Sequence, residues 1–282
     1  MNESSFRGVE KSSVTARASP CLEPLEPLES SLAKVDMYQK KLCPTKNASA
    51  DVSETGGSSG STSNEDLEKN WSGDIRFQHP YTAVLAGPTG SGKTQFIRNF
   101  LKNLKNLVVP VPTMILFCYA EWQPAYEEMK TFGLNIHFIK GVGDLDSLTQ
   151  GPPKLVIVDD LMAEADEQIT RLFTKGSHHK NISVMHIVQN LFSKNKEQRC
   201  INLNSHYMVV FKNPRDSSQI VHLAKQMYPN NVKVMQDAYK MATAEPWSYL
   251  LVDLKQNTPD HLRLRGEIFQ GQGRQTVYVP RK

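Results

Sequence analysis

The sequence predicts a three-layer α/β fold with a mostly parallel central sheet. From Trp71 onward, short apolar runs rich in β-branched residues alternate with longer segments of helical spacing. Uniformly apolar strands with helices between them are typical of a parallel sheet covered on both faces. A glycine-rich segment, residues 87–92, joins the first apolar run to the first helical segment.

The individual elements follow from the same alternation. We expect strands at Tyr81–Ala86, Thr113–Tyr119, Asn135–Ile139, Leu155–Asp159, Ile182–Gln189, Tyr207–Lys212 and Ser248–Leu254. We expect helices at Lys93–Leu104, Glu164–Lys175, Asp216–Met227 and Val232–Ala242. The final stretch, residues 256–282, either adds an edge hairpin through Leu262–Phe269 or lies across the body.

Residues 1–70 differ in composition from the rest of the chain. They contain a Leu-Glu-Pro repeat at residues 22–29 and a segment of almost only Ser, Thr and Gly at residues 53–63. Such a segment cannot bury enough apolar surface to offset the entropy lost on ordering. We therefore expect a disordered N-terminal tail over residues 1–70 and one folded domain over residues 71–282. Residues 32–42 could form a short helix when bound, and the tail is either a docking arm or a passive leader.

Charge is unevenly distributed between these two parts. Residues 1–70 carry 8 Lys/Arg and 11 Asp/Glu, and the remaining residues carry 25 and 18, so their net charges are −3 and +7. A basic body could attract a polyanion such as DNA, although an ordinary basic surface fits equally well. No run of about 18 apolar residues occurs, so the sequence predicts no membrane span.

The cysteines and histidines do not suggest a metal centre. The four cysteines are scattered, which favours an intracellular, reducing location without disulfides or structural zinc: Cys21, Cys43, Cys118 and Cys200. Cys118 is expected to be a buried thiol. Three histidines lack partners at ligand spacing, so we expect no zinc site from His178, His179 and His186.

Residues 87–94, Gly-Pro-Thr-Gly-Ser-Gly-Lys-Thr, match the phosphate-binding pattern G-x-x-x-x-G-K-[ST] between a strand and a helix. Glycine permits backbone conformations that turn successive N–H groups toward phosphate, aided by the positive end of the next helix. Lys93 would reach the β- and γ-phosphates, and the Thr94 hydroxyl would ligate Mg²⁺. The motif predicts a P-loop nucleoside triphosphatase (NTPase) that binds ATP with Mg²⁺ through Gly87, Pro88, Thr89, Gly90, Ser91, Gly92, Lys93 and Thr94.

Two carboxylates follow the buried strand Leu155–Asp159. The carboxyl ends of parallel strands share one edge of the sheet, where ligands of such folds bind. Asp159 would hold Mg²⁺, and Asp160 would act as the general base on the attacking water. The alternative is a strand that ends in two solvated acids.

Three further side chains are candidates for sensing or catalysis. Gln189, at a strand end, could hydrogen-bond the γ-phosphate or the attacking water, or simply cap the strand. Arg215, in an expected exposed turn, could reach a neighbouring subunit's nucleotide as an arginine finger, or pair with Asp216 on the surface. Arg199 could equally be the finger or a DNA contact.

Four segments in this order resemble the genome-packaging ATPases of Polinton/Maverick elements and adintoviruses, which belong to the FtsK–HerA superfamily and are related to the poxvirus packaging ATPase. These segments are His79–Thr94, Val156–Met162, Ile187–Phe192 and Phe211–Asp216. The resemblance covers roughly residues 71–282. Its first two motifs are shared by many ATPases, and the last two are more specific.

The resemblance implies a RecA-like sheet in which the Gln189 strand lies between the strands of the two phosphate motifs. It implies that Gln189 is the sensor and Arg215 a finger supplied in trans. It also implies a homo-oligomeric ring, hexameric in such relatives, that moves double-stranded DNA into a capsid. Capsid or portal proteins would be partners, in the host nucleus or at a viral assembly site. Asp160 departs from the Glu common in cellular relatives, and residues 1–70 match nothing in the family.

The expected function is therefore an ATP-hydrolysing DNA translocase. A nucleoside kinase would need a substrate pocket and an arginine-rich lid, which the sequence does not show. A GTPase would need Asn-Lys-x-Asp, and residues 195–198 lack the final Asp. An ATP-binding interaction or regulatory protein with little hydrolysis stays open as the alternative.

Overall fold

The structure is a computed structural model that describes residues 37–42, 74–145, 147–161, 166–192, 195–270 and 274–280. Apart from residues 37–42, the expected disordered tail lies outside the described residues. None of the helices in the described ranges is long and apolar enough to cross a bilayer.

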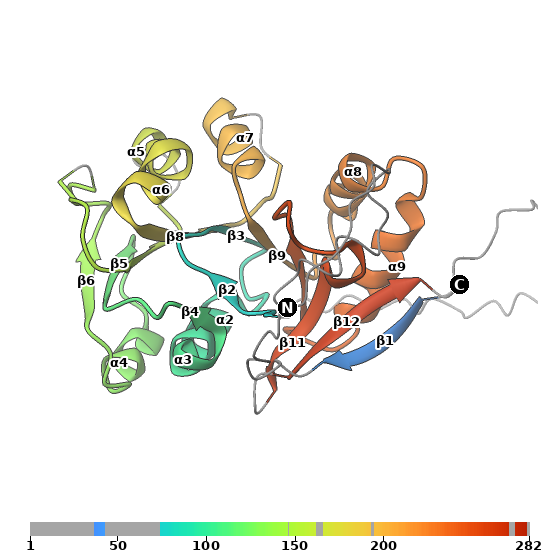
Figure 1. The fold of residues 1–282 in the computed structure, drawn as a ribbon, viewed down its shortest axis with the longest axis horizontal. Helices are drawn as coiled ribbons and strands as arrows, with labels where there is room; N and C mark the ends of the chain where they lie inside the picture. Colours follow the sequence, from blue (N-terminus) through green and yellow to red (C-terminus); the bar gives the residue numbers. More distant parts are fainter. Residues whose placement is uncertain are drawn as a thin grey trace, which may run out of the picture. The chain divides into compact units, whose positions relative to one another are not determined.

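A sheet of ten strands forms the centre of the folded body, in the order β1-β12-β11-β10-β9-β3-β8-β7-β5-β6 (Figure 1). The bounds are β1 Met37–Leu42, β3 Thr82–Ala86, β5 Met114–Tyr119, β6 Ile136–Lys140, β7 Lys154–Asp159, β8 Ile182–Val188, β9 Tyr207–Phe211, β10 Tyr249–Asp253, β11 Leu264–Gln270 and β12 Arg274–Pro280. The six strands from β9 to β6 are parallel. Two short strands, β2 Phe77–Gln78 and β4 Val108–Val109, form a separate parallel pair.

Helices cover both faces of the sheet (Figure 1). On one face lie α2 Lys93–Lys102, α3 Leu104–Leu107 and α4 Pro124–Lys130; on the other lie α5 Asp166–Arg171, α6 Ser177–Lys180, α7 Lys196–Leu203, α8 Ser218–Met227 and α9 Val232–Ala242. A π-helical turn, Leu172–Gly176, joins α5 to α6, and a 3₁₀ turn, Asp260–Leu262, precedes β11. Alternate residues of β3 enter two different cores, Val84 on the α5–α9 side and Leu85 on the α2–α4 side. The three-layer prediction is confirmed.

The strand β8 lies between β3 and β7, as the family resemblance implied. This arrangement brings the ends of the three motif-bearing strands to the same edge of the sheet, because all three are parallel. Within β8, His186 is 2% exposed, and burial lowers its pKa to about 4. Cys118 is fully buried in β5, as expected.

The remaining four strands of the sheet, β10, β11, β12 and β1, run antiparallel to their neighbours. Strand β10 runs opposite to β9, with Leu250 paired to Val210. Strands β11 and β12 form a hairpin, one of the two alternatives for the final stretch, but it extends beyond the expected Leu262–Phe269 and β1 lies outside it. Every residue of β10 is buried, so its apolar pattern equals that of a parallel strand. The pattern of apolar residues reports burial and not strand direction. The sequence therefore did not distinguish the parallel part of the sheet from the antiparallel part.

The strand β1 lies within the segment expected to be disordered, where a short helix on binding was considered. The structure has a strand there instead, antiparallel to β12 with Met37 opposite Pro280. An outer strand such as β12 presents unpaired N–H and C=O groups along its edge. Pairing with β1 provides hydrogen-bond partners for these groups of β12. Because β12 is distant in the sequence, the local composition of residues 37–42 does not reveal this pairing.

Four short helices, α3, α4, α6 and α7, lie wholly or mostly outside the expected helical ranges, and α4 and α7 have clear N-terminal signals. Helix α4 begins with Pro124, which suits the first helical position because its missing N–H has no partner there in any case. Helix α7 is capped by Asn195, whose side chain accepts from the Glu197 N–H at 3.1 Å. Both are short, and α4 matters for function because it brings Tyr126 to the edge of the sheet where β7 ends.

Candidate functional site: a phosphate loop and two carboxylates

The loop between β3 and α2 requires glycine at three positions. Gly90 and Gly92 have φ of 78° and 103°, which L side chains rarely adopt. Gly87 has no space for a side chain, since a Cβ there would lie 2.7 Å from both the Phe211 Cβ and the Ser91 Oγ. The loop is therefore held tightly against β9, and α2 begins directly after it at Lys93.

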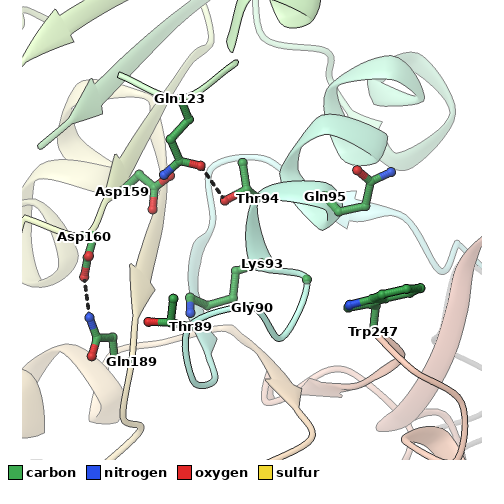
Figure 2. Close-up of a pocket in the computed structure, with 11 residues that line it drawn as sticks. Thr89, Gly90, Lys93, Thr94, Gln95, Gln123, Asp159, Asp160, Gln189 and Trp247 are labelled. Atoms are coloured by element: carbon green, nitrogen blue, oxygen red, sulfur yellow. Dashed lines mark hydrogen bonds between the residues drawn. The ribbon is translucent and has the colours of Figure 1, made fainter. Parts of the chain in front are cut away.

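The Lys93 ammonium turns back into the loop (Figure 2). Its Nζ donates to the carbonyl oxygens of Gly87 at 2.6 Å and Pro88 at 2.9 Å. Burial lowers the pKa of Lys93, and the carboxylates of Asp159 and Asp160 act in the opposite direction. The positive charge thus lies within the loop, close enough to Asp159 and Asp160 for their carboxylates to stabilise it.

Asp159 ends β7 and is 4% exposed. The Tyr126 hydroxyl donates to its Oδ2 at 2.7 Å. Burial raises the pKa of Asp159, and the hydrogen bond from Tyr126 opposes this shift because it stabilises the ionised carboxylate. Tyr126 itself is fixed by ring contacts with Phe117 and Phe138.

The oxygen donors at this edge fit Mg²⁺. Thr94 and Asp159 line the same cavity, and a hydroxyl with a carboxylate is the hard-oxygen set that Mg²⁺ prefers. The Thr94 hydroxyl donates to the Gln123 Oε1 at 3.1 Å, which leaves its oxygen lone pairs free to accept or coordinate.

Asp160 and Gln189 meet across neighbouring strand ends (Figure 2). The Gln189 Nε2 donates to the Asp160 Oδ1 at 3.3 Å. Asp160 is exposed and has a φ of 54°, a conformation that Asp and Asn tolerate better than most residues. The two residues that sequence analysis assigned to the attacking water and to γ-phosphate sensing therefore lie in direct contact.

These groups surround one cavity of about 730 Å³. Its lining includes most residues predicted from the motifs and adds three that were missed: Gln95, Gln123 and Trp247. Gln123 and Trp247 come from loops that no motif marks. Only the long-range packing of β5 and β10 beside β7 and β9 brings them to the cavity, so no local signal could have identified them.

The two candidate arginines lie elsewhere. Arg215 and Arg199 are exposed, and neither is among the residues that line the cavity. The side chain of Asn213 accepts from the backbone N–H of Arg215 at 3.1 Å and of Asp216 at 3.3 Å, which fixes the turn before α8. In the described part of the chain, Arg215 forms no ion pair with Asp216, the alternative considered from the sequence.

The bond from Tyr126 to Asp159 gives a pH prediction. In Tyr126→Phe the ionised carboxylate loses a donor, so the pKa of Asp159 rises further. If ionised Asp159 is needed for turnover, the acid limb of the ATPase pH profile should move to higher pH, with only a small change above that limb. A pH–rate profile measures this, with Tyr119→Phe as control, since Tyr119 packs on Tyr126 and pairs with Asp159 through the backbone, while the hydroxyl that donates to Asp159 is that of Tyr126. An unmoved acid limb would contradict the role of Asp159.

The parallel sheet, the glycine loop between β3 and α2, and the acids at the same edge together form the fold of P-loop NTPases. No protein-family model and no curated protein matches the chain. The chain is similar in fold to the genome-packaging NTPase B204 of Sulfolobus turreted icosahedral virus 2, solved with ATP-gammaS, at 13% identity and a TM-score of 0.41, covering 63% of this chain and 94% of that one.

Two further solved structures show the same kind of likeness. One is the cytoplasmic domain of the type VII secretion ATPase EccC of Thermomonospora curvata, at 12% identity and a TM-score of 0.41, with 62% of this chain and 24% of that one covered. The other is a KaiC-like protein of Pyrococcus horikoshii, at 15% identity and a TM-score of 0.36, with 73% and 92% covered. At such identities the likeness concerns the fold alone.

Proposed function

We propose that this chain hydrolyses ATP with Mg²⁺ at the cavity between the phosphate loop and β7. One observation carries the proposal: the Lys93 ammonium lies inside a glycine loop at the same sheet edge as Asp159 and Asp160. A cation and backbone N–H groups grip a triphosphate, while an acid nearby can take a proton from water.

Each residue has a role in this proposal. The loop amides hold the β-phosphate, and Lys93 exchanges its bonds to the Gly87 and Pro88 carbonyls for phosphate oxygens. Asp160 accepts the proton of the attacking water, and Gln189 holds that carboxylate and senses the γ-phosphate. Mg²⁺, held by Thr94 and Asp159, would neutralise charge on the phosphates.

The work driven by hydrolysis is, in our proposal, movement of double-stranded DNA, ending in its packaging into a capsid. Two observations support this role: the motifs at residues 187–192 and 211–216 resemble those of packaging ATPases, and residues 71–282 carry a net charge of +7.

Duplex DNA should stimulate ATP turnover, and the affinity of the protein for DNA should fall steeply with salt, because lysines and arginines that bind phosphates displace counterions. Turnover measured with and without duplex at several salt concentrations tests this. Equal rates at every salt concentration would overturn the DNA role while leaving the ATPase intact.

The family resemblance assigns Arg215 a role between subunits, and its exposed position leaves it accessible to a neighbouring copy. Arg215→Ala should lower turnover about 10³-fold or more in the assembled ring, as for other arginine fingers, with ATP binding largely retained. Mixing this variant with Lys93→Ala should restore part of the activity, because each supplies what the other lacks at a shared interface. The same mixture with Arg199→Ala is the matched control. Absence of rescue at every mixing ratio contradicts a finger in trans.

A further inference from the structure

The turn between α9 and β10 has an unusual residue at its third position. The Ser248 N–H donates to the Glu245 carbonyl at 3.4 Å, Pro246 follows Glu245, and Trp247 has a φ of 61°. Proline second and a positive φ third are the features of a type II turn, in which the third residue is ordinarily Gly or Asn. A bulky aromatic residue with this backbone conformation is strained, and such strain collects at functional sites.

This turn packs directly on the phosphate loop. A Cβ added to Gly92 would lie 3.0 Å from the Trp247 Cβ and 3.4 Å from its Cα. Gly92 therefore has to be glycine for two reasons, its φ of 103° and the presence of Trp247. The backbone of the turn packs against the loop, while the side chain of Trp247 points outward and the residue is 70% exposed.

The indole lines the cavity opposite the acids. Figure 2 shows Lys93 between the two groups, with Asp160 and Gln189 on one side and Trp247, near Gln95, on the other. Among the described residues, Trp247 makes no contact with another aromatic ring. Its flat face is thus available within the cavity, at the end away from the residues assigned to γ-phosphate.

We propose that Trp247 is the platform on which the nucleobase stacks. This rests on the proposed nucleotide site: with the γ-phosphate near Asp160 and the phosphates held by Lys93, the nucleoside extends toward the opposite end, where Trp247 lies. An indole can stack on any flat base, so this contact would contribute to the affinity for nucleotide and little to the specificity for one base. The strained turn holds the indole in place, and Gly92 allows it to approach the loop.

The test compares a ligand that has a base with one that lacks it. The full chain and its Trp247→Gly and Trp247→Phe variants are titrated calorimetrically with Mg·ATP and with Mg·tripolyphosphate. Trp247→Gly should weaken ATP binding roughly 5- to 100-fold and leave tripolyphosphate binding unchanged, and Trp247→Phe should retain much of the ATP affinity. Leu203→Ala, which removes an equally exposed apolar side chain from α7, should change neither.

The variant is also expected to fold at least as well as the parent, because glycine relieves the positive φ at residue 247; a thermal melt checks this. Equal weakening of both ligands, or no change in either, overturns the stacking role. A lost oligomer with an unchanged ATP-to-tripolyphosphate ratio overturns it too, and would place the indole at an interface between copies. If the parent chain binds neither ligand, the proposed nucleotide site itself is wrong.

Discussion

Replacing Lys93 with Ala should lower the affinity for Mg·ATP by about two to three orders of magnitude and abolish measurable turnover. The ammonium is the cation of the loop, where it bonds to the Gly87 and Pro88 carbonyls. Without it, the triphosphate would enter a cavity that still holds the negative charges of Asp159 and Asp160. Both the lost attraction and the uncompensated repulsion act against binding.

Calorimetry with Mg·ATP and a phosphate-release assay measure these two effects. Lys102→Ala is the matched control, since Lys102 is an exposed residue of the same helix and its loss changes the net charge equally. The control should behave like the parent. That result would show that the effect of Lys93→Ala comes from the position of the lost charge and not from the change in net charge. Full activity in the Lys93 variant would rule out the assignment of residues 87–94 to the triphosphate.

Replacing Asp160 with Asn should slow hydrolysis by about 10²- to 10⁴-fold, the usual worth of a positioned general base, while ATP binding is retained. Asn has the same shape as Asp, tolerates the φ of 54° and can still accept from Gln189 through its amide oxygen. The substitution therefore removes the proton acceptor and its charge with little other change. Loss of a negative charge near the γ-phosphate should, if anything, strengthen ATP binding.

Single-turnover hydrolysis and equilibrium binding, measured on the same preparation, separate the two effects. Asp144→Asn serves as the control, because Asp144 is an exposed acid outside the cavity lining. An unchanged rate in Asp160→Asn would mean that this carboxylate takes no part in hydrolysis. It would favour the alternative of an ATP-binding protein that turns over little.

The sequence predicted the parts of the fold that depend on local pattern. The loop before Lys93 and the strand before Asp159 are each specified by a few consecutive residues, and both lie where they were expected. The burial of β10 was also readable, but its direction was not, because a buried strand of either direction shows a near-continuous apolar run, here Tyr249–Val252. Strand β1 depends on a partner more than 200 residues away along the chain.

The residues of the candidate site that the sequence did not predict were missed for the same reason, because they depend on contacts between distant segments of the chain. Tyr126 reaches Asp159, and Gln123 reaches Thr94, through contacts between segments about 30 residues apart. Trp247 contacts the loop across a still longer separation. None of these residues belongs to a motif, so only the packed structure reveals that they share a cavity with the phosphate loop.

The positive φ of Asp160 explains how two consecutive acids can serve one ligand. Adjacent side chains of an extended strand project to opposite faces of the sheet, so a straight continuation of β7 would send one carboxylate into a layer of helices. The left-handed residue breaks this alternation one position after Asp159, and both acids line the same cavity. A β-branched residue at position 160, which resists that conformation, would straighten the chain and, in the proposed mechanism, move the site of proton transfer away from the site of Mg²⁺ binding.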